Sequence, residues 1–232
     1  MVKHKLRERF RPYSVEVRSL TEKALDASIR MQDIPGYIGS GADSVVCRLS
    51  CDPDIVAKLP IIESSGIKPS KAVKESVGAL VLGMGVPGLE QIVAYRRARP
   101  SAVLCRFVPG QTLRNVAADS WRIPTEHFAG LLATFKAMQE RELATDTGGS
   151  NLVYDPEAGL TVIDYIKSRK QTLAQKVLEF ASPETLLAGI SIGATVPEHA
   201  LRFRNVCATE LGPEIAADMN QMWRKDCLIV PA

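Results

Sequence analysis

The chain lacks the features that mark secreted, membrane-spanning and nucleic-acid-binding proteins. Its five cysteines are odd in number and widely scattered, so they match neither a disulfide framework nor a zinc site and favour a reducing compartment. No apolar stretch approaches the ~20 residues of a membrane span, and none near the start resembles a cleaved signal. Basic and acidic side chains number 29 and 26, a balance that does not indicate nucleic acid. We therefore expect a cytoplasmic protein with no membrane span.

The chain is long enough, at 232 residues with 46% hydrophobic content, to bury a sizeable core. It contains no internal repeat and no low-complexity segment. The one local charge excess is near the N-terminus, where one acidic side chain, Glu8, accompanies the basic residues Lys3, Lys5, Arg7, Arg9 and Arg11. A solvated or frayed basic tail and a surface for an anionic partner both fit this run.

Hydrophobic periodicity and turn residues divide the chain into predicted elements. We expect helices over 15–30, 68–84 and 125–142, and strands over 44–49, 55–59, 91–97, 102–107, 152–154 and 160–163. The turn 146–150 should end the long third helix, and the 68 residues after position 164 have a helical composition broken by Pro and Gly. The order of elements predicts an α+β protein with a strand-rich first part and a helical second part.

A glycine-containing loop precedes a lysine-bearing strand. Gly39, Ser40 and Gly41 begin a run that continues to Val46, and two glycines allow main-chain amides to approach an anionic ligand closely. Taken alone, the run is more typical of an ordinary hairpin turn than of an anion site. Because Lys58 ends the next strand, its ammonium should point from the sheet beneath that loop, and a phosphate chain could lie between them.

A carboxylate is expected to orient this lysine by a charge-assisted hydrogen bond. Glu75, in the following predicted helix, and Glu63, in the loop before that helix, both qualify. We favour Glu75 because of its helical position, and the choice between the two stays open.

Three polar residues form the strongest pattern. Asp146 and Asn151 lie five residues apart in the predicted turn, and Asp164 follows a short apolar strand 13 residues after Asn151. Each alone is typical of a turn or strand end. Together, in this order, they provide what phosphoryl transfer needs, namely a carboxylate near an acceptor hydroxyl and oxygen ligands for magnesium.

Between residues 37 and 166 these motifs resemble those of the protein-kinase-like superfamily. The run 39–46 is similar to its glycine-rich loop, with Ser44 at the third glycine, and residues 56–58 to its Val-Ala-Ile-Lys strand. Residues 104–113 resemble the hinge that receives adenine, which implies that Arg106 and Val108 contact ATP. Residues 146–151 resemble the catalytic loop and residues 162–165 the strand ending in Asp-Phe-Gly.

The resemblance implies a bilobal kinase-like fold. Its expected parts are a basic and helical leader (1–35), a β-rich N-lobe (36–108) and a reduced helical C-lobe (109–232). It implies that Asp146 and Lys58 are catalytic, that Asn151 and Asp164 bind Mg²⁺ or Mn²⁺, and that ATP is the cofactor. The loop, Lys58, Glu75, Arg106 and Val108 would hold the nucleotide.

Departures from the family pattern narrow the expected function. Ala144 and Thr145 stand where the family has His and Arg, which argues against activation through an arginine that grips a phosphorylated loop. Ile166 replaces the last glycine of Asp-Phe-Gly. The segment after Asp164 is too short for the substrate-binding part of an ordinary kinase, so the resemblance is to a minimal kinase.

Three functions fit these residues. The first is a minimal protein kinase with a protein Ser/Thr substrate, similar to the compact type III secreted kinase effectors that bacteria inject into a host cytoplasm. The second is a small-molecule phosphotransferase of the aminoglycoside and choline kinase type, and Lys167, Arg169 and Lys170 argue against its acidic acceptor pocket. The third is a pseudokinase that only binds partners. The joint presence of Lys58, Asp146, Asn151 and Asp164 argues against it.

Overall fold

The computed structural model describes residues 2–26, 28–40, 44–60, 69–98, 101–115, 122–145, 148–168, 170–182 and 184–231. It confirms a mixed α+β protein. The chain forms two compact units, described separately below. Unit 1 comprises Met1–Gly85 and Glu90–Phe107, and unit 2 comprises Val86–Leu89 and Val108–Ala232.

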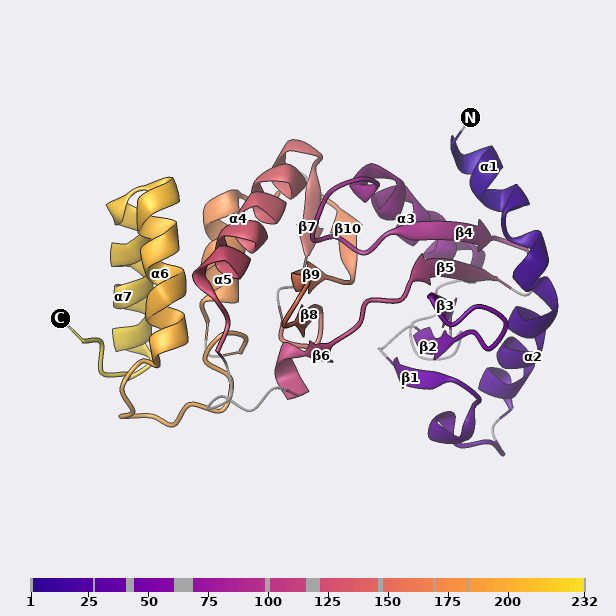
Figure 1. The fold of residues 1–232 in the computed structure, drawn as a ribbon, viewed down its shortest axis with the longest axis horizontal. Coiled ribbons are helices and arrows are strands. Elements are labelled where there is room, and N and C mark those ends of the chain that lie inside the picture. The colour runs from indigo at the N-terminus through magenta and orange to yellow at the C-terminus, as the bar shows by residue number, and fades with distance from the viewer. Residues whose placement is uncertain are drawn as a thin grey trace. The chain divides into compact units, whose positions relative to one another are not determined.

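Unit 1 is built on a five-stranded antiparallel sheet in the order β1-β2-β3-β5-β4 (Figure 1). Its strands are β1 (Tyr37–Ser40), β2 (Ser44–Arg48), β3 (Ile55–Pro60), β4 (Ile92–Arg96) and β5 (Ala102–Arg106). Four match predicted strands to within a residue or two, whereas β1 was not predicted as a strand. The sequence signal for β1 is weak because it is four residues long and half of it is Gly39 and Ser40.

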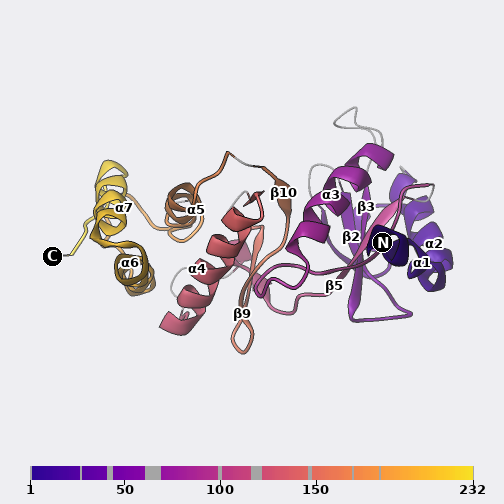
Figure 2. The ribbon, with the colours of Figure 1, turned by 90° about the horizontal axis from the view of Figure 1, so that it is seen from above.

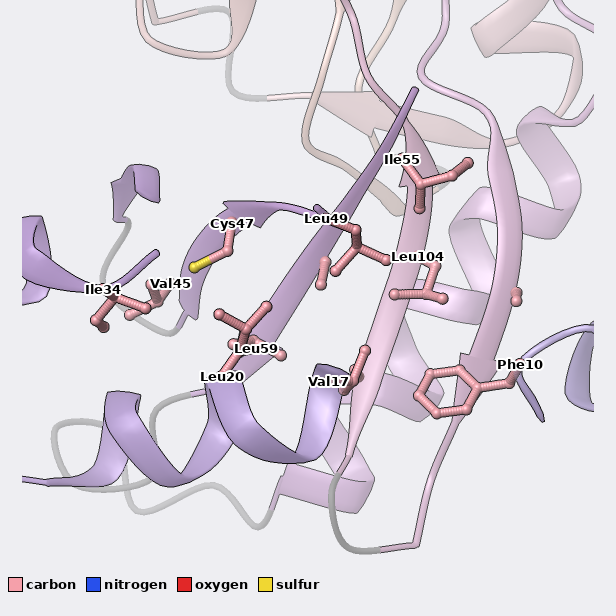
Figure 3. Packing of buried hydrophobic residues seen from close by; sticks show 13 residues of the cluster. Phe10, Val17, Leu20, Ile34, Val45, Cys47, Leu49, Ile55, Leu59 and Leu104 are labelled. Atoms are coloured by element: carbon pink, nitrogen blue, oxygen red, sulfur yellow. The ribbon is translucent and has the colours of Figure 1, made fainter. Parts of the chain in front are cut away.

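One face of this sheet is covered by α2 (Ser14–Leu25). Val17 and Leu20 of the helix are buried against Leu59 and Leu104 of the sheet, and Figure 3 shows these side chains pointing toward one another. Alternation along a strand places every second residue on this face. Val56 and Lys58 therefore lie on the opposite face of β3 from Leu59.

The N-terminal segment is helical and packs against the sheet, so it is not frayed, whereas its basic side chains are exposed, as expected of a solvated basic surface. Helix α1 (Val2–Glu8) buries Leu6 and packs beside β4, and the 3₁₀ turn η1 (Arg11–Tyr13) follows. Arg7 donates from Nε to the Tyr95 hydroxyl at 3.0 Å and stacks over that ring. A second 3₁₀ turn, η2 (Met31–Asp33), precedes β1. Leader helix α2 ends at Leu25, earlier than predicted.

The helix α3 (Pro69–Gly83) packs against β3, β4 and β5. It begins at Pro69, where the missing N–H and fixed φ of proline suit a first helical position. It ends near Gly85, whose φ of 74° is a left-handed conformation that glycine adopts without strain. Its bounds agree with the predicted helix.

The described residues of unit 2 form two small sheets, a 3₁₀ turn and four helices (Figure 2). The sheets are β6-β8-β9, from β6 (Gln111–Thr112), β8 (Leu152–Asp155) and β9 (Gly159–Val162), and β10-β7, from β7 (Leu143–Thr145) and β10 (Tyr165–Lys167). The 3₁₀ turn is η3 (Leu113–Asn115), and the helices are α4 (Thr125–Glu140), α5 (Leu173–Phe180), α6 (Glu198–Leu211) and α7 (Pro213–Lys225).

An aromatic cluster holds the helices of unit 2 together. Phe180 on α5 has its ring 4.7 Å from that of Phe203 on α6 and 6.4 Å from that of Phe128 on α4, all with edge-to-face or tilted geometry. All three are fully buried. On α7, Trp223 donates from Nε1 to the Ala181 carbonyl at 2.8 Å, which anchors that helix to the end of α5.

The end of α4 differs from the prediction in a way that affects the candidate site. The polar turn does not follow the helix directly, because the strand β7 lies between them. Glu142 adopts a φ of 56°, which stops the helix, and the chain then extends over three buried residues. A strand of three residues is too short to show the alternation of apolar and polar residues by which strands are predicted.

The described helices include none that is both long and apolar enough to cross a membrane.

Candidate functional site

A row of residues crosses the sheet of unit 1 at Lys58. The strand register pairs Gly39 with Val46, Val46 with Lys58, and Lys58 with Val103. Directly opposed residues project to the same side of a sheet, so Val46 and Lys58 are neighbours on the face away from α2. A Cβ added at Gly39 would meet no atom of the described residues within 4 Å.

The structure brings part of the predicted glycine loop to Lys58. Gly39 and Ser40 belong to β1, where the Ser40 hydroxyl is 3.2 Å from the Tyr37 hydroxyl, and Val46 belongs to β2. Gly41 lies outside the described residues. The predicted placement of a loop next to the lysine strand is therefore visible at both ends of the loop.

Lys58 forms an ion pair that the sequence did not suggest. Its Nζ is 2.7 Å from Oε2 of Glu90, whose side chain is 4% exposed, while Lys58 itself is 19% exposed. Glu90 lies two residues before β4, between Leu89 and Gln91. An acidic residue inside the mainly apolar run 86–95 is a signal that could have found it, because a buried carboxylate requires a partner.

The two carboxylates considered from the sequence are not both described. Glu75 lies on α3, as predicted, with an exposed side chain. Its assignment to Lys58 stays a prediction. Glu63 lies outside the described residues.

The predicted adenine hinge follows β5. Arg106 is the exposed last residue of the strand and pairs with Ile55, and the next amide, that of Phe107, donates to the Asp54 carbonyl at 2.7 Å. Arg48 stacks on the Phe107 ring with its guanidinium carbon 4.2 Å from the ring centre. Val108, half-buried, begins the long stretch of unit 2. Contact of Arg106 and Val108 with adenine stays a prediction.

In unit 2, the β8–β9 hairpin brings Asn151 and Asp164 to one end. Leu152 pairs with Val162, and the Ile163 amide donates to the Asn151 carbonyl at 2.8 Å. Asn151 therefore lies beside Ile163, one residue from Asp164. Residues 13 apart in sequence become neighbours because the hairpin folds back at the turn ending in Gly159, whose φ is 86°.

Asp164 has an unusual backbone conformation. Its φ is 102°, outside the regions that residues other than glycine normally adopt, and its side chain is exposed. Such a conformation has a free-energy cost and persists only where neighbouring structure imposes it. Here the Thr145 hydroxyl donates to the Asp164 carbonyl at 3.0 Å, and Tyr165 pairs with Thr145 across β10 and β7.

Asp146, the predicted catalytic carboxylate, lies outside the described residues. It follows Thr145, the buried last residue of β7, and precedes by two residues Gly148, whose carbonyl accepts from the Asn151 amide at 2.8 Å. The described neighbours of Asp146 on both sides are thus fixed by hydrogen bonds.

A polar network behind Thr145 was missed in the sequence. The Gln171 amide accepts from the Thr145 N–H at 3.0 Å and donates to the Thr145 carbonyl at 2.9 Å and to Glu179 at 2.6 Å. Lys176, fully buried, donates to the Gln171 carbonyl at 2.9 Å. Burial lowers the pKa of Lys176, and the nearby Glu179 charge opposes that shift. No sequence motif marks this network, because Thr145 and Gln171 lie 26 positions apart.

In the described part of the chain, no three His, Cys, Asp or Glu side chains gather into a metal-binding group. The metal prediction therefore rests on Asn151 and Asp164. Comparisons with protein-family models and with curated proteins give no match.

Proposed function

We propose that the chain is an ATP-dependent phosphotransferase, a minimal protein kinase with a bilobal kinase-like fold, which transfers phosphate to Ser or Thr hydroxyls of a protein. The observation that carries this proposal is the β8–β9 hairpin, which makes Asn151 and the backbone-strained Asp164 neighbours. An amide oxygen followed by an aspartate at a strand end is the arrangement that protein kinases use for magnesium.

Unit 1 supplies the second line of support. Lys58 is on the third strand of the sheet, the position of the ATP-anchoring lysine in kinases, and is opposed by Val46 at the end of the glycine loop. The proposal assigns the Lys58 ammonium to phosphate oxygens and Glu90 to the role of its orienting carboxylate. The ion pair at 2.7 Å would restrict the rotamers of Lys58 before a nucleotide binds.

The donor chemistry of the hairpin fits a hard divalent cation. Asn151 offers a carbonyl oxygen and Asp164 a carboxylate, and Mg²⁺ is usually bound by one or two such groups together with phosphate oxygens and water. The exposure of Asp164 leaves its carboxylate accessible. When bound, the cation would neutralise charge on the phosphates, and Mn²⁺ could replace it.

Asp146 is the residue that we assign to the hydroxyl group of the acceptor. In the proposed reaction it orients the hydroxyl and accepts its proton, while the acceptor oxygen bonds to the terminal phosphorus of ATP and the bond to ADP breaks. The assignment depends on the sequence position of Asp146, between the end of β7 and the turn that leads to Asn151.

A protein acceptor is favoured by the charge of the segment after Asp164. Lys167 and Lys170, just after Asp164, are exposed, whereas an acceptor pocket for a cationic small molecule would need acidic side chains. An extended peptide presents its hydroxyl without requiring the protein to enclose it.

The test is transfer of label from [γ-³²P]ATP to whole-cell lysate with Mg²⁺ or Mn²⁺, followed by acid hydrolysis of the labelled protein. We expect phosphoserine or phosphothreonine, and a rise in melting temperature when ATP and metal are added, since a ligand that binds only the folded state stabilises it. Label confined to small molecules would replace the protein acceptor with a metabolite. Absence of both label and melting shift, with either metal, would refute the proposal.

A further inference from the structure

The Gln171 side chain forms hydrogen bonds with the main chain at one edge of strand β7. Among the described strands, β7 pairs with β10 alone, and the N–H and C=O of Thr145 face its other edge. Thr145 is 3% exposed, so both groups need partners within the protein. The Gln171 primary amide provides both, one as acceptor and one as donor.

The Gln171 side chain is itself held from two directions. Its second amide hydrogen goes to Glu179 Oε2 at 2.6 Å, so both donors are used. Its own carbonyl accepts from the buried Lys176 ammonium at 2.9 Å, which fixes the main chain from which the side chain starts. A separate capping box, made by Thr172 and Gln175, begins α5 and does not contact the Gln171 side chain.

From Thr145 the hydrogen bonds continue to the proposed metal ligand. The Thr145 hydroxyl donates to the main-chain carbonyl of Asp164, the residue with a φ of 102°. Gln171 thus fixes the backbone of Thr145, and Thr145 fixes the backbone of Asp164. In sequence, Thr145 also immediately precedes Asp146.

We propose that Gln171 is a positioning residue for phosphoryl transfer, which holds the end of β7 and, through Thr145, the backbone of Asp164. This inference rests on the proposed function. Gln171 does not contact the reacting atoms. Its contribution is to keep Asp164 and the start of the Asp146 turn at a fixed separation, and transfer depends strongly on such geometry.

The test compares Gln171→Met, which keeps the length of the side chain and removes its hydrogen bonds, with Gln175→Ala. The control removes a capping contact four residues away, near the start of α5, and does not touch Thr145. Maximal rate and apparent KM for ATP are measured with [γ-³²P]ATP and a fixed amount of lysate. Gln171→Met should lower the maximal rate about 10- to 100-fold, with KM for ATP changed by less than about threefold. Gln175→Ala should keep the wild-type rate.

Thr145→Val provides the second arm, because it removes the hydroxyl while keeping the branched shape. If both residues act through one chain of contacts, the double variant should be no slower than the slower single variant. The inference would be overturned if the rate reductions of the two single variants multiplied in the double variant. It would also be overturned if Gln171→Met had the same rate as the control Gln175→Ala.

Amide hydrogen exchange separates this inference from the proposed function. The Thr145 amide should exchange faster in Gln171→Met than in wild type, whether or not ATP is turned over. If the wild-type protein transfers no phosphate, the proposed function fails and the assignment to phosphoryl transfer fails with it. Exchange unchanged in Gln171→Met, with transfer intact in wild type, would overturn the inference alone.

Discussion

Breaking the Lys58–Glu90 ion pair should destabilise the protein by different amounts depending on which partner is removed. Lys58→Met leaves a carboxylate that is 4% exposed without the ammonium 2.7 Å away, whereas Glu90→Gln leaves an ammonium on a side chain that is 19% exposed and can be partly hydrated. Removing one partner of a fully buried pair costs 3–5 kcal/mol, so we expect a loss of about 3 kcal/mol for Lys58→Met. For Glu90→Gln, solvent screening reduces the expected loss to about 1–2 kcal/mol.

The double variant Lys58→Met/Glu90→Leu removes both charges and fills the same space with apolar groups. Its free energy of unfolding should lie within about 1 kcal/mol of wild type, because neither charge remains to be desolvated. Urea unfolding followed by circular dichroism measures all four proteins. The account would be wrong if the double variant were as unstable as Lys58→Met. It would also be wrong if Lys58→Met had the same free energy of unfolding as wild type. The double variant should transfer no phosphate although it is folded.

Three further outcomes follow from single side chains. Burial lowers the pKa of His199 below its ordinary 6.5, so its contribution to stability should be complete above about pH 6.5 and lost as pH falls further; His199→Gln should flatten that part of a pH–stability curve. Partial burial and a hydrogen bond to Glu16 raise the pKa of Cys51 to about 11, so at pH 8 only about a thousandth is thiolate. Mass spectrometry should find that Glu16→Gln accelerates the alkylation of Cys51 by iodoacetamide. Asp146→Asn should bind magnesium-ATP in calorimetry with nearly the wild-type affinity and transfer phosphate far more slowly. If the affinity were lost together with transfer, Asp146 would be a metal ligand instead.

Elements with long, regular patterns were predictable from the sequence. Helix α4 repeats apolar residues from Phe128 to Met138 at helical spacing, and its observed bounds differ from the prediction by two residues at the C-terminal end. The β8–β9 hairpin was predictable too, because Asp155-Pro156 and Gly159 mark its turn. These local signals depend only on neighbouring residues.

Contacts between distant residues could not be predicted. Glu90 meets Lys58 because β4 and β3 both pair with β5, and the sequence does not specify that strand order. Gln171 forms hydrogen bonds with the main chain of Thr145 in β7, a strand of three residues that is too short to show a hydrophobic alternation. In both cases a buried polar group obtained its partner through the tertiary fold, which local propensity does not determine.

The measurement that tests the phosphotransferase proposal most directly compares Asp164→Asn with Glu157→Gln. Each removes one exposed carboxylate next to the β8–β9 hairpin, Asp164 just after β9 and Glu157 in the turn at the opposite end of the hairpin. We expect Asp164→Asn to abolish transfer of label from [γ-³²P]ATP to lysate protein while its melting temperature stays close to that of wild type, because its charge is needed chiefly when the metal is bound. Glu157→Gln should transfer label at the wild-type rate. Full activity in Asp164→Asn would contradict the proposal.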